Sequence, residues 1–144
     1  VGFTMIELIF FIVILGILAS VALPKLAATR SAAQIAKMAT YVATLVSDIG
    51  AHYTSQGVTA TNWGDMTNVA IKTVGGVAPT GDTASTVTVY LSDGTTDCIS
   101  FAVTTDGNLT VADETGGTTV CDEAALKTLS LQKVHNFGGI GVAN

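Results

Sequence analysis

The hydrophobic positions of the chain follow three different spacings, and each spacing predicts a different element. Between Phe3 and Leu23, 17 of the 21 residues are apolar, so this run is hydrophobic on every side of a helix. Further along, apolar residues recur every three or four positions, which predicts a helix with one buried stripe: Ile35, Met38, Val42, Leu45 and Ile49. Between Thr86 and Val111, apolar and polar residues alternate, which predicts strands.

The first two patterns join into one long N-terminal helix. It is predicted to end near Tyr53, because Thr54–Gly57 supplies a stop signal. The first half of this helix is apolar all round and is expected to protrude. The second half is amphipathic and is expected to lie on a domain.

The alternating region predicts three antiparallel strands, near residues 86–91, 98–103 and 109–111, with turns at Asp93-Gly94 and Asp106-Gly107. Their apolar face should pack against the stripe on the helix. The predicted fold class is therefore α+β, with a long N-terminal α-helix packed on a small antiparallel sheet of three to four strands. Short helices are expected at Met66–Lys72 and Asp122–Lys133. Trp63 is expected to plug the loop before the sheet, and a role at a subunit contact is the alternative.

Composition and charge narrow the function classes. The 144 residues carry 6 Lys+Arg and 11 Asp+Glu, for a net charge of -5, and no basic cluster is present. Nucleic-acid binders need a basic footprint, so no nucleic-acid binding is expected. The two histidines, His52 and His135, lie far apart in sequence, and neither a phosphate-binding loop nor a nucleophile motif occurs. We therefore expect neither an enzyme nor a cofactor.

The apolar run has a membrane-spanning length and contains one charge. About 21 helical residues span roughly 30 Å, the thickness of one bilayer core. Glu7 is the one charged residue in the run, and a charge at mid-bilayer costs roughly 2.5–3.5 kcal/mol, so such residues usually have a partner. Nearer the end of a span, Glu7 could instead reach the interface. Gly16 and Pro24 weaken the helix, because glycine is flexible and proline removes a backbone donor.

The N-terminal motif resembles a known family. Gly2 and Phe3, followed by Thr-Met-Ile, Glu7 and an uncharged apolar span, are similar to the start of type IV pilins and related pseudopilins. The resemblance implies that a prepilin peptidase cleaves after Gly2 and that Phe3 is then N-methylated. It divides the chain into two residual leader residues (1–2), a transmembrane and filament-core helix (3–24) and a head domain (25–144).

The same resemblance implies how such a chain assembles. The terminal amine of Phe3 on one subunit would pair with Glu7 of a neighbour and set the axial register. The helix between Gly16 and Pro24 is expected to lose its regular structure in the filament. The partners implied are identical subunits in a helical homopolymer, the inner membrane before assembly, the prepilin peptidase and the pilus assembly machinery. The implied location is the inner membrane first and then an extracellular surface filament.

Cys98 and Cys121 are the only cysteines of the chain. An exported chain favours a disulfide between them, and pilins commonly carry a C-terminal disulfide loop that this pair resembles. Two thiols and two distant histidines do not form a zinc site, and the spacing of the acidic residues does not match a calcium loop, so no metal is expected. Asn108-Leu109-Thr110 is a glycosylation sequon, but Asp106-Gly107-Asn108 is a good turn, and the turn is the favoured interpretation.

Two alternatives stay open at this point. One is a pseudopilin of a type II secretion or competence system, which forms only short filaments. The other is a monomeric, membrane-anchored binding domain, which needs no peptidase site. The sequence does not separate adhesion, twitching motility, DNA uptake and electron conduction as roles for a fibre.

Overall fold

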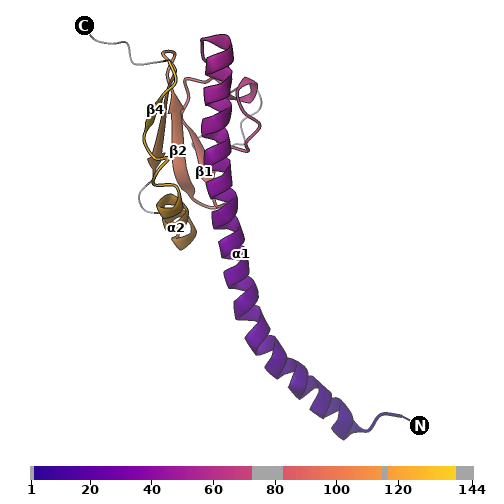
Figure 1. Ribbon diagram of the computed structural model, residues 1–144. Coiled ribbons are helices and arrows are strands. Elements are labelled where there is room, and N and C mark those ends of the chain that lie inside the picture. Colours follow the sequence, from indigo (N-terminus) through magenta and orange to yellow (C-terminus); the bar gives the residue numbers. More distant parts are fainter. Residues whose placement is uncertain (1, 73–82, 115–116, 139–144) are drawn as a thin grey trace. The chain divides into compact units, whose positions relative to one another are not determined.

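The computed structural model describes residues 2–72, 83–114 and 117–138. Its elements in chain order are the helix α1 (Met5–Gln56), the 3-10 helix η1 (Trp63–Asp65), the strands β1 (Val89–Ser92), β2 (Asp97–Val103) and β3 (Asn108–Asp113), the helix α2 (Thr119–Lys127) and the strand β4 (Val134–Asn136) (Figure 1). The fold is α+β, as predicted. The chain separates into two compact units, one ending at Ala33 and one, the head, beginning at Gln34.

The strands of the head form one antiparallel sheet in the order β1-β2-β3-β4. Phe101 in the middle of β2 lies opposite Val89 of β1 and Val111 of β3. Strand β4 pairs with β3 between Asn108 and Thr110 and forms one edge of the sheet. Glycines with positive φ stand in the two predicted turns, at Gly94 and Gly107, where the left-handed backbone favours glycine.

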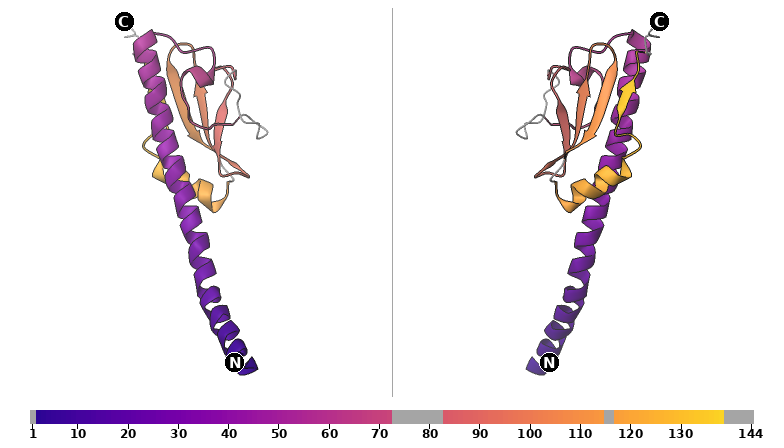
Figure 2. Two further views of the ribbon diagram at one scale, coloured as in Figure 1. Left: turned by 90° about the vertical axis from the view of Figure 1, so that its right-hand side faces the viewer. Right: turned by 90° about the vertical axis from the view of Figure 1, so that its left-hand side faces the viewer.

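The core of the head lies between the sheet and the second half of α1, which runs along one face of the sheet (Figure 2). All five residues of the predicted stripe, from Ile35 to Ile49, are buried. They meet the inward side chains of the sheet, namely Val89, Leu91, Ile99, Phe101, Leu109 and Val111. The helical and strand periodicities were therefore sufficient to predict both sides of this core.

Trp63 closes the core beside η1. Only 1% of its surface is exposed, and its indole Nε1 donates a hydrogen bond to the carbonyl of Val87 at 2.8 Å. The prediction of a packing role for Trp63 is confirmed. The same contact also explains why β1 begins at Val89 rather than at Thr86, because the backbone near Val87 serves the tryptophan instead of the sheet.

The predicted helix at Met66–Lys72 is wrong. The backbone of Lys72 instead donates to the carbonyl of Tyr90 and accepts from its N–H, at 2.8 and 2.6 Å. Ile71 beside it is buried in the core. Pairing with the sheet therefore overrides the weak helical pattern of this segment.

The ends of α1 and α2 differ from the predicted ones, and local hydrogen bonds satisfy backbone groups there. Helix α1 ends at Gln56, slightly beyond the predicted Tyr53, where Gly57 adopts a φ of 74° and its N–H reaches the carbonyl of Tyr53. Helix α2 covers Thr119–Lys127 and not the predicted Asp122–Lys133. Thr118 caps its start, and the Thr128 hydroxyl contacts the carbonyls of Ala124 and Ala125 at its end.

Candidate functional site

The unit before Gln34 is the first part of α1, and its apolar side chains are exposed. Every residue from Gly2 to Arg30 is exposed. Phe3 is 94% exposed, and Phe10 and Phe11 remain 69% and 61% exposed. Soluble monomers rarely expose a contiguous apolar area of this extent. By length and composition α1 could cross a membrane. The exposed segment Phe3–Leu23 is called the apolar segment below.

Glu7 is engaged with Thr4 at the first turn of α1. One oxygen of its carboxylate accepts hydrogen bonds from the Thr4 backbone N–H and from the Thr4 hydroxyl, both at 3.0 Å. In return the Thr4 hydroxyl oxygen accepts from the Glu7 N–H at 3.3 Å. This reciprocal arrangement is a capping box, and it satisfies backbone donors that the start of a helix leaves open.

The capping box gives Glu7 a local role that the sequence analysis missed. The spacing Thr-x-x-Glu before an apolar run was the available signal. Thr4 therefore joins Phe3 and Glu7 among the residues of the candidate site. Phe3 and Glu7 line a common groove together with Leu8 and Phe11. Any pairing of Glu7 with another subunit would have to add to its bonds with Thr4 or replace them.

Gly16 and Pro24 lie inside a continuous helix in the single chain. Pro24 has no N–H to offer the carbonyl of Ser20. In the same stretch, the Ser20 hydroxyl donates to the carbonyl of Ile17 at 2.7 Å. A methyl group added at Gly16 would meet nothing within 4 Å. Packing within the subunit therefore does not require glycine at position 16. Loss of helix between Gly16 and Pro24 in a filament stays a prediction.

Cys98 and Cys121 form the disulfide that was expected. The bond joins β2 to α2 across a Cα–Cα distance of 4.8 Å, and both residues are buried. The chain-entropy model assigns about 3–4 kcal/mol to closing a loop of this length. The disulfide therefore ties α2 to the sheet of the head.

Asp93 lies beside the disulfide and organises the neighbouring turn. Its carboxylate accepts from the N–H groups of Thr95 and Thr96, from the Thr95 hydroxyl and from the Thr118 hydroxyl. Partial burial raises the pKa of Asp93, but the bonds from Thr118 and from the backbone outweigh it and lower the pKa to about 2.

Asp93 is also the centre of a potential ligand cluster. Its oxygens lie near the sulfurs of Cys98 and Cys121, the one grouping of three metal-ligating side chains in the described part of the chain. The sulfurs are bonded to each other, and the carboxylate already accepts four hydrogen bonds. This grouping therefore has a structural role in the oxidised protein.

The remaining candidate residues stay separate from this cluster. Asn108 is half-buried at the start of β3, where its backbone N–H meets the Thr104 hydroxyl and the residue pairs with Asn136. Its glycosylation stays a prediction. Gly2 is exposed, with open space around it, whereas Val1 lies outside the described residues.

His52 and His135 have different surroundings in the described head. Asp48 accepts from the Thr67 hydroxyl at 2.7 Å, whereas Nδ1 of His52 is buried without a partner. Nε2 of His135 lies 2.8 Å from the carbonyl of Leu131, and its ring stacks on Phe137. The contacts of His135 hold its ring within the head.

Comparison of the chain with protein-family models, curated proteins and solved structures gave no match. Functional inference therefore depends on the apolar segment, the capping box and the head.

Proposed function

We propose that this chain is a structural subunit of the type IV pilin kind, which polymerises into a surface filament through its apolar segment. The subunit would be held in the inner membrane before assembly. During assembly the apolar segment would exchange lipid for the helices of neighbouring subunits. The head would then form the outer wall of the fibre.

The exposed apolar surface of Phe3–Leu23 is the observation that carries this proposal. It covers all sides of the helix, so a single packed face could not bury it. A bilayer and a bundle of identical helices both can. The second half of the same helix supplies the core of the head, so each subunit would present one apolar segment and one independently packed domain.

Glu7 supplies a means of setting register in such a bundle. A carboxylate among apolar helices is costly without a partner, and a terminal amine is costly in the same way. Pairing the amine of a processed Phe3 with Glu7 of a neighbour would satisfy both groups. A buried polar pair of this type contributes to specificity of position more reliably than to stability.

The proposal is tested on material sheared from the cell surface. Negative-stain images should show long thin fibres, and mass analysis of their subunit should show cleavage after Gly2 and a methyl group on Phe3. Short, scarce filaments with the same processing would instead support a pseudopilin. The absence of this chain from any fibre would refute the proposal.

One observation favours a second candidate, a monomeric membrane-anchored domain. Thr4 already satisfies Glu7 within the single chain, so the acid does not require a neighbouring subunit. An intact N-terminus on a subunit that stays in the membrane fraction would support this candidate. Methylated Phe3 would eliminate it.

A further inference from the structure

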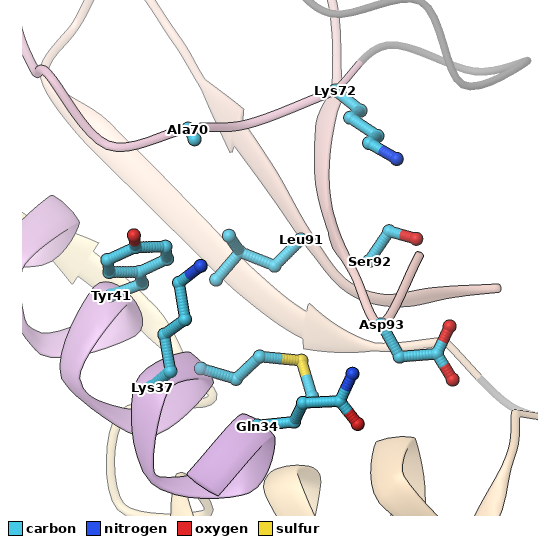
Figure 3. Close-up of a pocket in the computed structure, with 9 residues that line it drawn as sticks. Gln34, Lys37, Tyr41, Ala70, Lys72, Leu91, Ser92 and Asp93 are labelled. Atoms are coloured by element: carbon cyan, nitrogen blue, oxygen red, sulfur yellow. The ribbon is translucent and has the colours of Figure 1, made fainter. Parts of the chain in front are cut away.

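A cavity of about 220 Å³ opens on the head between the second half of α1 and strand β1. Met38 and Leu91 give it a buried apolar floor, since they are only 4% and 2% exposed. Lys37 reaches it from α1, and Lys72 reaches it from the segment that pairs with β1 (Figure 3). The cavity therefore combines an apolar base with two ammonium groups.

Both lysines start from well-held positions. The Lys37 Nζ lies 5.2 Å from the centre of the Tyr41 ring, a cation–π distance. The backbone of Lys72 is joined to Tyr90 by two hydrogen bonds. Figure 3 shows the two side chains on either side of Leu91. A ligand in the cavity would meet two positive charges. The Lys37 ammonium group is held by its contact with the Tyr41 ring, and Lys72 is held through its backbone.

Neither Lys37 nor Lys72 forms an ion pair with a carboxylate within residues 2–72, 83–114 and 117–138. Asp93 also lines the cavity and accepts hydrogen bonds from the hydroxyls and N–H groups of Thr95, Thr96 and Thr118. Its negative charge offsets one of the two ammonium charges, so the cavity keeps a net positive charge. Within the described residues the cavity thus holds two ammonium groups against one carboxylate, in a chain with 6 Lys+Arg against 11 Asp+Glu. Their chemistry suits a carboxylate on a short apolar stem.

We propose that this cavity receives an acidic side chain from a second copy of the chain. The inference rests on the proposed function, since it requires that copies assemble. Each copy has a net charge of -5, so neighbouring heads repel unless their few cations face acids. Exposed carboxylates are plentiful on the described head: Asp65, Asp106, Asp113, Asp122 and Glu123.

The geometry of such a contact agrees with polymer growth. A cavity on one copy that takes a side chain from a different surface of the next copy forms a heterologous interface, which can propagate as an open helix. Within a homopolymer, the neighbour also presents its carboxylates at high effective concentration, which a free small acid would not match. We therefore assign the second copy, and not a free carboxylate, as the occupant.

The test compares matched double variants of the full chain. Lys37→Gln with Lys72→Gln removes both cavity charges, whereas Lys127→Gln with Lys133→Gln removes two exposed charges elsewhere on the head. Both variants change the net charge equally. Because partly exposed pairs contribute modestly, we expect the cavity variant to raise the free-subunit concentration above filaments by about fivefold at low salt. The control variant should raise it less, and Lys→Arg replacements at positions 37 and 72 should restore it.

Carbodiimide cross-linking of unmodified filaments identifies the occupant. An amide link from Lys37 or Lys72 to an acid of another copy, found in cross-linked dimers by peptide mass mapping, would support the inference. Filaments whose intersubunit links involve only other lysines would overturn it while leaving the proposed function intact. A small-acid adduct in native mass spectra that depends on both lysines, without such links, would also overturn it. Failure of the unmodified chain to form filaments would overturn both proposals.

Discussion

The two units of the chain differ in what happens to their apolar side chains: the head buries a core of them, and the apolar segment leaves them exposed. In the head, the chain itself removes Leu45, Ile49 and Trp63 from water. In the apolar segment, leucines and isoleucines such as Ile9 and Leu15 are left exposed. The head therefore has its own source of stability, whereas the stability of the apolar segment depends on its surroundings. The same substitution should therefore lower the folding stability of the head when made in the head, and filament yield when made in the apolar segment.

The largest expected effect is on assembly and concerns Glu7. Glu7→Ala should leave a folded, membrane-held subunit but reduce filament yield at least tenfold, because the register contact is lost. Thr4→Ala removes the threonine side chain of the capping box while keeping the acid, so it serves as the matched control. Filament yield is measured in sheared fractions against total subunit. Equal yields for Glu7→Ala and the unmodified chain would contradict the register role.

Leucines at two positions of α1 test the contrast most directly. Leu45 is fully buried in the head, and Leu45→Ala should lower the free energy of unfolding by about 3 kcal/mol. Leu15 is 48% exposed, and Leu15→Ala should leave that free energy nearly unchanged while it reduces filament yield. Denaturation of the full chain in detergent, followed by Trp63 fluorescence, reports on the head. A similar loss of head stability from both substitutions would mean that the two units are not independent.

Acid should destabilise the head through Asp93. Because the pKa of Asp93 falls from 3.8 to about 2 on folding, its carboxylate stabilises the head above pH 4, and this contribution is lost between about pH 4 and pH 2. Asp93→Asn should cost about 1 kcal/mol at neutral pH and flatten the acid limb. Unfolding curves from pH 2 to pH 7 check this prediction. An unchanged acid limb in Asp93→Asn would assign the acid sensitivity to other carboxyl groups.

A comparably small effect is expected at Gly16, in the apolar segment and not in the head. Since the position has open space around it, Gly16→Ala should stabilise the local helix by about 1 kcal/mol. If helix loss accompanies assembly, the same substitution should slow filament growth. Hydrogen exchange of the subunit and timed assembly check the two effects separately. Faster hydrogen exchange near residue 16 in the variant would contradict the predicted stabilisation of the helix.

The sequence predicted most reliably those features that depend on periodic burial. Ile35 to Ile49 and Phe101 could be assigned to the core because a helix and a strand each repeat their orientation at a constant spacing. The Cys98–Cys121 bond followed from the number of cysteines and from the resemblance. Lys72 was misassigned because its backbone pairs with Tyr90, a contact between distant positions that no local pattern carries. The cavity formed by Lys37 and Lys72 depends on the same pairing.

Thr4 was missed for a different reason, since its signal is local but was read as part of a processing motif. The capping box has a consequence for timing. A helix end that satisfies its own donors and its own acid can remain in lipid without a partner. On the proposed function, subunits could then accumulate as a reserve in the membrane. The supply of neighbouring subunits, and not the energetic cost of an unpaired carboxylate, would set when each subunit leaves the membrane.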